Sequence, residues 1–158
     1  ETEAGFGAIS LEGDLMLNQQ LVQSLRLTPE IIQQQKKPVE QELRERNLLF
    51  RGNRPLPELA QRTVVLVDDG LASGVTMAVA ASVARRRKPA KVIIASPTAP
   101  LSTVRKLGDS ADIIICPNIR EGFYFAVASA YRRWHDLEHD EVTGLLQESG
   151  WLHGPASG

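Results

Sequence analysis

The chain has 158 residues, of which 42% are hydrophobic and 23% are charged, and its formal net charge is −1 at pH 7. This composition fits one globular domain with a hydrophobic core and excludes disorder as the main state. The balance of 18 basic against 19 acidic side chains gives no argument for a nucleic-acid or membrane partner. No apolar stretch approaches the roughly 20 residues that span a bilayer. No signal peptide is visible, so we expect a cytoplasmic protein.

The start of the chain predicts a β-hairpin and a short helix. Apolar residues lie on both sides of Gly13, which can adopt the positive φ of a tight turn, so residues 5–17 predict a hairpin. Asn18 follows as a candidate N-cap, because its side chain can accept a hydrogen bond from the first turn of a helix over residues 19–25.

A longer helix is predicted next. Thr28 supplies a capping hydroxyl and Pro29 fits the first helical position, so this helix begins there. Pro38 is expected to interrupt or kink it. Residues 51–62 are rich in arginine, proline and glycine, which predicts an exposed loop.

The middle of the chain alternates apolar runs with helical patterns. Residues 64–67, 91–96 and 112–116 predict strands, and residues 75–87 and 101–107 predict the helices between them. This order is typical of βαβ units, in which the strands are parallel. The first run is unbroken, apolar and β-branched, and it further predicts a strand that is buried on both faces.

Together these elements predict one α/β domain over residues 1–150. We expect a mostly parallel sheet flanked by helices, with a small hairpin and helical hood. The C-terminal part, about residues 123–148, is expected to be helical. Residues 151–158 are expected to form a flexible tail, because residues 153–158 are mostly small and rich in glycine and proline. The single cysteine, Cys116, follows an apolar run and is interpreted as a buried thiol at a strand end.

The string V-V-L-V-D-D-G-L-A-S-G-V-T-M, residues 64–77, carries the chemistry. Asp68 and Asp69 stand at the carboxyl end of a predicted strand, where open parallel sheets bind ligands. Small residues and hydroxyls then lead into a helix N-terminus, where unpaired N–H groups and the helix dipole favour a phosphate. Carboxylates would repel that phosphate, but they suit ribose hydroxyls, directly or through hydrated Mg²⁺. The string therefore predicts a clamp for a sugar phosphate.

Three alternative structures fit this string less well. A receiver domain also places adjacent acids at a strand end, but near the chain start and with a further aspartate after a later strand. A Walker A loop requires G-K-[ST], which the string lacks. A strand–helix turn that holds its acids by chance is the simplest alternative.

The string resembles the phosphoribosyl-diphosphate (PRPP) binding signature of type I phosphoribosyltransferases, in which apolar residues precede two acids and a small-residue loop. G-A-I at 7–9, E-G-D-L-M-L-N at 12–18 and F-Y-F-A-V at 123–127, with Tyr131, are similar to a group of uncharacterised bacterial and archaeal phosphoribosyltransferases. This wider resemblance runs over most of residues 3–146. It implies PRPP and a nitrogenous base as substrates and Mg²⁺ as cofactor. Many relatives dimerise, so a homodimer is a candidate assembly.

The resemblance implies roles for the residues of the string. Asp68 and Asp69 would bind the ribose hydroxyls and would hold Mg²⁺ indirectly, through its bound water or the ribose. The remaining substrate-binding residues would be Gly70, Ala72, Ser73, Gly74, Val75 and Thr76. Purine salvage members carry a base-contacting aspartate where Ala72 stands, which argues against purine salvage. Family members also have a strand and a pyrophosphate-binding loop before the point where this chain starts, so we expect the first part of the fold to be missing.

Two further pairs of residues are candidates by analogy with the family. Arg51 and Arg54 precede the string, in a region where a mobile loop of the family closes over the pyrophosphate. An arginine there could stabilise the charge of the leaving group, and a solvated helix end and loop is the alternative. Phe123 and Tyr124 could stack on the acceptor base or pack in the core.

Three functions follow as hypotheses. The first is an enzyme that transfers the phosphoribosyl group of PRPP to a nitrogenous base and releases pyrophosphate. The second is a non-catalytic domain that senses PRPP or a nucleotide. The third is a truncated remnant with a structural role.

Overall fold

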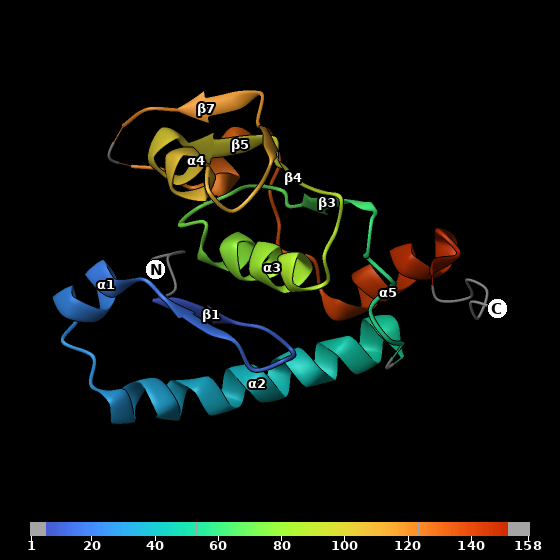
Figure 1. Cartoon of the computed structure of the whole chain (residues 1–158), viewed down its shortest axis with the longest axis horizontal. Helices are drawn as coiled ribbons and strands as arrows, with labels where there is room; N and C mark the ends of the chain where they lie inside the picture. Colours follow the sequence, from blue (N-terminus) through green and yellow to red (C-terminus); the bar gives the residue numbers. More distant parts are fainter. Residues whose placement is uncertain (1–5, 53, 123, 152–158) are drawn as a thin grey trace.

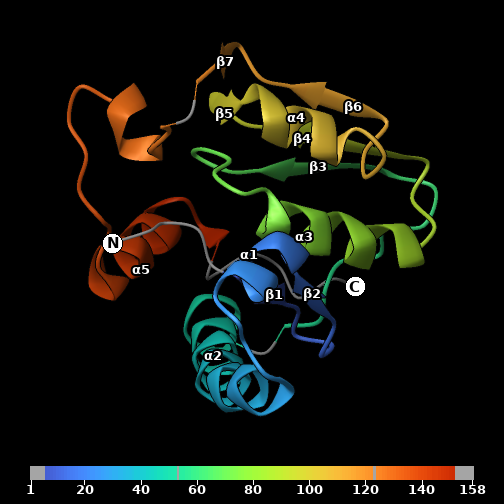
Figure 2. The ribbon, with the colours of Figure 1, turned by 90° about the vertical axis from the view of Figure 1, so that its left-hand side faces the viewer.

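The computed structural model describes residues 6–52, 54–122 and 124–151. A parallel sheet lies on α3, α3 lies on a β-hairpin, and the hairpin lies on α2 (Figures 1 and 2). The elements in chain order are β1 (Gly7–Ile9), β2 (Leu15–Leu17), α1 (Gln19–Ser24), α2 (Pro29–Arg51), β3 (Thr63–Val67), α3 (Val75–Arg86), β4 (Lys91–Ala95), β5 (Thr98–Pro100), α4 (Leu101–Leu107), β6 (Ile113–Ile115), β7 (Asn118–Arg120), the 3-10 helix η1 (Val127–Ala130) and α5 (His139–Glu148).

The described strands form one antiparallel and two parallel groups. β1 pairs with β2 as the predicted hairpin, and β3, β4 and β6 form a parallel sheet in the order β3–β4–β6. β5 and β7 form a separate parallel pair that the sequence did not predict. The α/β class with parallel strands flanked by helices is thereby confirmed.

The predicted helix starts are confirmed, but the interruption at Pro38 is not. Asn18 accepts a hydrogen bond from the Leu21 amide at 3.3 Å, and Thr28 accepts one from the Ile31 amide at 3.4 Å. α2 continues through Pro38 to Arg51. Proline leaves one carbonyl of the preceding turn without its helical partner, and water can satisfy that carbonyl because this side of α2 is exposed.

The core lies between the parallel sheet and the helices α3 and α4. One buried cluster joins Ala81 and Ala84 of α3 to Val92 of β4. Its neighbour consists of Leu71, Met77, Ile94, Ala99 and Leu107. Because both clusters include residues of α3, the packing fixes the N-terminus of this helix against the carboxyl ends of the strands.

The opposite face of the sheet is exposed and apolar. The register aligns Val65 with Ile93 and Ile113, and Val67 with Ala95 and Ile115, so these rows share one face. Val67 is 74% exposed and Ile115 is 53% exposed. The prediction that the first strand is buried on both faces is therefore wrong. β3 lies at the edge of the sheet, and α3 packs on only one of its faces.

The C-terminal part is less helical than predicted. Helical turns occur at η1 and in α5, but residues 131–138 belong to no helix. α5 begins where Glu138 and Glu141 form a capping box, since each side chain accepts a hydrogen bond from the backbone of the other residue. Of the predicted tail, residues 152–158 lie outside the described part of the chain. No described helix combines the length and the apolar character needed to cross a membrane.

Charged residues join the hairpin turn to the end of α3. Arg86 pairs with Glu12 at 2.9 Å and also with Asp14, and Arg87 pairs with Glu12. Hydrogen bonds from Arg86 and Arg87 lower the pKa of Glu12, and those from Ser10 and Arg86 lower the pKa of Asp14. The pairs thus contribute stability above the unfolded carboxyl pKa values, and this contribution is lost as the pH falls through the folded ones.

Arg86→Gln is expected to loosen the hairpin. At pH 6 and low salt, amides of residues 8–17 should exchange with solvent roughly two- to fivefold faster, which is the scale of exposed ion pairs. At ~1 M salt the difference should disappear, because the Debye length is then only about 3 Å. Arg105→Gln, an exposed arginine of α4, is the control. Equal exchange in Arg86→Gln and the wild type at low salt would contradict the expectation.

Candidate functional site

The turn between β3 and α3 holds most of the predicted site residues together. The Asp68 amide extends the parallel ladder by donating to the Ala95 carbonyl at 3.2 Å. Leu71 is buried, and its amide donates to the Thr98 carbonyl at 3.0 Å. Gly74 has φ +77° and is the N-cap of α3. The turn is therefore fixed at both ends and in its middle.

Several backbone amides of this turn have no hydrogen-bond partner among the residues that the structure describes. The first helical hydrogen bond runs from the Ala78 amide to the Gly74 carbonyl at 2.9 Å, and the Val75 amide donates to Ser73 Oγ at 3.4 Å. Within the described part of the chain, no hydrogen bond is donated by the amides of Ala72, Ser73, Gly74, Thr76 and Met77. Unpaired amides at the positive end of a twelve-residue helix favour an anion.

Two glycines let neighbouring segments approach the turn closely. A Cβ at Gly74 would lie 2.8 Å from Thr103 Cγ2 of α4, and a Cβ at Gly70 would lie 2.3 Å from Val127 Cγ1 of η1. Real Cβ atoms do not make contacts this short. Both positions therefore require glycine for space, and Gly74 also requires it for its positive φ.

The two acids differ in their surroundings. Asp68 is half-buried, and burial raises the pKa of its carboxyl group, with a smaller contribution from the neighbouring charge of Asp69. Asp68 Oδ1 accepts a hydrogen bond from the Asp69 amide at 3.0 Å, which opposes that rise. The Asp69 side chain is exposed, while its carbonyl accepts a hydrogen bond from Tyr131 Oη at 2.6 Å.

A polar cavity of about 140 Å³ opens at this turn. It is lined by Gly7, Asp68, Gly70, Leu71, Ala72, Ser73, Gly74, Val75, Thr76 and Met77. Gly7 comes from β1, so the predicted hood contributes one wall of the cavity. No lysine or arginine is among the described lining residues, and the charge of the cavity comes from backbone amides and the Asp68 carboxyl group.

Comparison with known proteins identifies the family. Residues 11–131 match the phosphoribosyl transferase domain. The chain belongs to this family. It is 32% identical over 149 residues to "Putative phosphoribosyl transferase MT0597" and "Putative phosphoribosyl transferase Rv0571c", from two strains of Mycobacterium tuberculosis. Each match covers 94% of this chain and 33% of the relative, so the chain spans about one third of the length of these relatives.

A solved structure supports the same relationship. The crystal structure of TT1426 from Thermus thermophilus matches with a TM-score of 0.67 and 29% sequence identity. The match covers 91% of this chain and 67% of that chain. The type I fold implied by the resemblance of residues 64–77 is thus confirmed for this phosphoribosyl transferase domain.

The predicted arginines lie away from the turn. Arg51 ends α2, and its guanidinium donates to the carbonyls of Arg54 at 3.3 Å and Pro55 at 2.9 Å. The Arg54 guanidinium lies 5.2 Å from the ring centroid of Trp151. This region leads into the amino end of β3, whereas the acids lie at its carboxyl end (Figure 1). The structure therefore does not bring Arg51 and Arg54 to the β3–α3 turn.

Of the two predicted stacking residues, the structure describes one, and that residue does not line the turn cavity. Tyr124 is fully exposed, and Phe123 lies outside the described residues. A described aromatic residue that reaches the turn is Tyr131, whose hydroxyl group donates to the Asp69 carbonyl. No local pattern in the sequence identifies this contact, which joins residues 62 positions apart.

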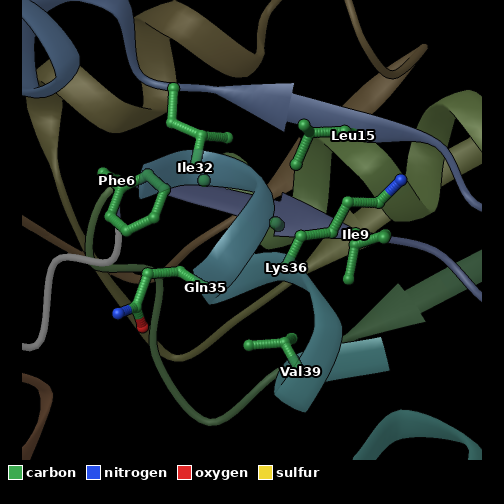
Figure 3. Close-up of a pocket in the computed structure, with 9 residues that line it drawn as sticks. Phe6, Ile9, Leu15, Ile32, Gln35, Lys36 and Val39 are labelled. Carbon is green, nitrogen blue, oxygen red and sulfur yellow. The ribbon is translucent and has the colours of Figure 1, made fainter. Parts of the chain in front are cut away.

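A second, apolar cavity of about 180 Å³ lies between the hairpin and α2. Figure 3 shows Ile9 and Leu15 of the hairpin beside Ile32 and Val39 of α2. The only ionic group in its described lining is Lys36, whose ammonium group pairs with Glu40 at 3.4 Å. This cavity offers no converging donors for a phosphate among its described residues, so the turn is the better candidate site.

Asp68→Asn is expected to preserve or raise stability at neutral pH. A carboxyl group whose folded pKa is raised stabilises the fold below its unfolded pKa, and that contribution is lost as the pH rises through the folded pKa. The asparagine Oδ1 can still accept the Asp69 amide. Thermal midpoints of both proteins from pH 3 to pH 8 test this. A variant that is clearly less stable than the wild type at pH 8 would contradict the assignment.

Proposed function

We propose that the β3–α3 turn binds PRPP and that this domain transfers its phosphoribosyl group to a nitrogenous base, with release of pyrophosphate. The observation that carries the proposal is that the amides of Ala72, Ser73, Gly74, Thr76 and Met77 donate no hydrogen bond among the described residues and line the same cavity as the Asp68 carboxyl group. Membership of the phosphoribosyl transferase family supports the same reaction class.

The amides suit the 5-phosphate of PRPP. They lie at the N-terminus of α3, where the helix dipole adds to their attraction for negative charge. Ser73 and Thr76 line the same cavity, and their hydroxyl groups are further candidate donors. Small residues at Ala72 and Gly74 leave the backbone open to a bound phosphate, while Gly70 lies beside the acids, on the side of the sugar.

The carboxyl groups suit the ribose hydroxyls and Mg²⁺. Asp68 lines the cavity, and the exposed carboxyl group of Asp69 follows it in the chain, so both are candidate oxygen ligands. No group of three or more histidine, cysteine, aspartate or glutamate side chains that could hold a metal ion occurs among the described residues. We therefore expect the two carboxyl groups to supply only some of the ligands of Mg²⁺, with oxygens of the substrate and water completing its coordination. The bound Mg²⁺ would neutralise charge on the pyrophosphate.

The reaction requires displacement of pyrophosphate from C1 by a nucleophilic nitrogen. The turn supplies orientation, because it would hold the 5-phosphate and the sugar of the substrate in one position. Its residues do not identify the acceptor base. Ala72 occupies the place where purine salvage members carry an aspartate, which argues against a salvaged purine and leaves a pyrimidine or another heterocycle as the candidate acceptor.

A second candidate is a domain that binds PRPP or a nucleotide without catalysis. The favouring observation is that the described lining of the turn cavity contains no lysine or arginine to stabilise a pyrophosphate leaving group. On either view, these 158 residues should bind ribose 5-phosphate and PRPP with similar affinity, since both ligands offer the same phosphate and sugar.

Binding titrations and a turnover assay test the proposal together. Calorimetry with ribose 5-phosphate and PRPP, each with Mg²⁺, should give binding of both ligands. Pyrophosphate release should be measured with adenine, guanine, hypoxanthine, xanthine, uracil and orotate. Slow turnover with a base would indicate that phosphoribosyl transfer needs groups beyond these 158 residues. Brisk turnover would indicate that these residues suffice for the reaction. Failure to bind either ligand would contradict the proposed function.

A further inference from the structure

Two carbonyl groups of the β3–α3 turn accept hydrogen bonds from hydroxyl groups far along the chain. Tyr131 Oη donates to the Asp69 carbonyl at 2.6 Å. Thr103 Oγ1, which is buried in α4, donates to the Ala72 carbonyl at 2.5 Å. Both carbonyls therefore have partners on the protein side of the turn.

Each of these bonds also sets the direction of an amide. In a planar trans peptide the C=O and N–H groups point in opposite directions. Tyr131 thereby orients the N–H of Gly70, and Thr103 orients the N–H of Ser73. Gly70 and Ser73 both line the turn cavity, and within the described residues neither amide donates a hydrogen bond. The two hydroxyl groups thus hold two separate donors available for a ligand.

Neighbouring residues hold Tyr131 in its position. η1 packs against the turn so closely that Val127 occupies the space beside Gly70. Arg120 of β7 donates to Ser129 of η1 at 2.7 Å, which ties η1 to the small parallel sheet. The ring of Tyr131 lies 5.1 Å from that of Trp134, centroid to centroid. The segment that carries Tyr131 is therefore held in place by contacts other than the hydrogen bond to Asp69.

We infer that Tyr131 is a positioning residue for the sugar-binding half of the turn, and that Thr103 positions the phosphate-binding half independently. The inference rests on the proposed function, in which Asp68, Asp69 and Gly70 face the sugar and the amides from Ala72 onward face the 5-phosphate. Tyr131 acts through the Asp69–Gly70 peptide rather than by touching the ligand.

The test compares Tyr131→Phe and Thr103→Val with two probes, ribose 5-phosphate and inorganic phosphate. Tyr131→Phe removes only the hydroxyl group, so affinity for ribose 5-phosphate should fall about three- to tenfold, the scale of one neutral hydrogen bond. Affinity for inorganic phosphate should stay within about twofold, because that probe needs only the amides near Ser73. Thr103→Val should weaken both probes.

Amide resonances of the ligand-free protein give a second readout. Tyr131→Phe should shift the Gly70 amide more than the Ser73 amide, and Thr103→Val should do the reverse. Equal loss of both probes in Tyr131→Phe, or no loss of either, would overturn the inference while leaving the proposed function intact. Absence of ribose 5-phosphate binding by the wild type would instead overturn the proposed function itself, and with it the assignment of Tyr131.

Discussion

Gly74→Ala is expected to abolish high-affinity phosphate binding and to destabilise the fold. Residue 74 has φ +77°, which costs an L-residue about 1–2 kcal/mol. The new Cβ would lie 2.8 Å from Thr103 Cγ2 and 3.3 Å from Leu107 Cδ1, and such overpacking typically costs about 1–3 kcal/mol more. To relieve the contact, the turn must move, and the amides at the start of α3 would move with it.

The two effects are measured separately. Denaturant unfolding should show a loss of roughly 2–5 kcal/mol in the free energy of unfolding, which leaves a domain of ordinary stability largely folded. Phosphate affinity should fall roughly tenfold to hundredfold for each charge-assisted bond that is lost. Gly52→Ala is the matched control, because Gly52 has φ +57° at the end of α2 and nothing within 4 Å of a new Cβ. Gly52→Ala should lose only the stability that a positive φ costs an alanine, and it should bind phosphate with normal affinity.

Comparison of these two glycine variants separates the effect of a strained backbone on stability from the effect of a displaced turn on ligand binding. If Gly74→Ala binds ribose 5-phosphate as well as Gly52→Ala does, the phosphate does not bind at the turn. If both variants lose the same stability, the contact with Thr103 and Leu107 is absent in solution.

The double variant Asp68→Asn/Asp69→Asn is expected to lose ribose 5-phosphate binding without losing the fold. Each carboxylate is a charged acceptor for a hydroxyl group or for Mg²⁺, and each such bond is worth roughly 1.5–3 kcal/mol, so affinity should fall about a hundredfold or more. Folding should be preserved, because burial raises the pKa of Asp68 and the ionised group therefore costs stability at neutral pH.

The control for this variant removes the same charge elsewhere. Asp109 and Asp136 are both exposed, so Asp109→Asn/Asp136→Asn matches the change in net charge. Calorimetric titrations with Mg²⁺ should show normal affinity for the control. Wild-type affinity should also rise as the pH increases through the raised pKa of Asp68, and this dependence should be missing in Asp68→Asn. Equal affinity in the double variant and the control would remove the acids from the site.

Local sequence patterns predicted most of the elements around the site. The turn chemistry of Gly13, the caps Asn18 and Thr28, and the apolar runs at residues 64–67 and 91–96 each act over a few residues, and the corresponding elements are present. The 14-residue string likewise predicted a strand, a turn and a helix N-terminus, all of which the structure contains. These features depend on neighbours in the chain, which a sequence displays directly.

The features that the sequence did not predict depend on distant partners. The exposure of Val67 follows from the edge position of β3, which no property of residues 64–67 reveals. The hydrogen bonds of Tyr131 and Thr103 to the turn span 62 and 31 positions. The paired strands β5 and β7 are only three residues long and contain prolines or polar residues, so their pattern is too short to distinguish from a loop.

The most direct test of the proposed site is a titration of the isotope-labelled protein with ribose 5-phosphate and Mg²⁺, followed through its backbone amide resonances. If the ligand binds at the β3–α3 turn, saturable shifts should be concentrated in the amides of residues 70–77, with smaller changes at Gly7 on the facing wall of the cavity. Shifts that cluster instead at Phe6, Ile32 and Val39, around the apolar cavity, would contradict this site. So would a titration that leaves the amides of residues 70–77 unchanged at millimolar ligand.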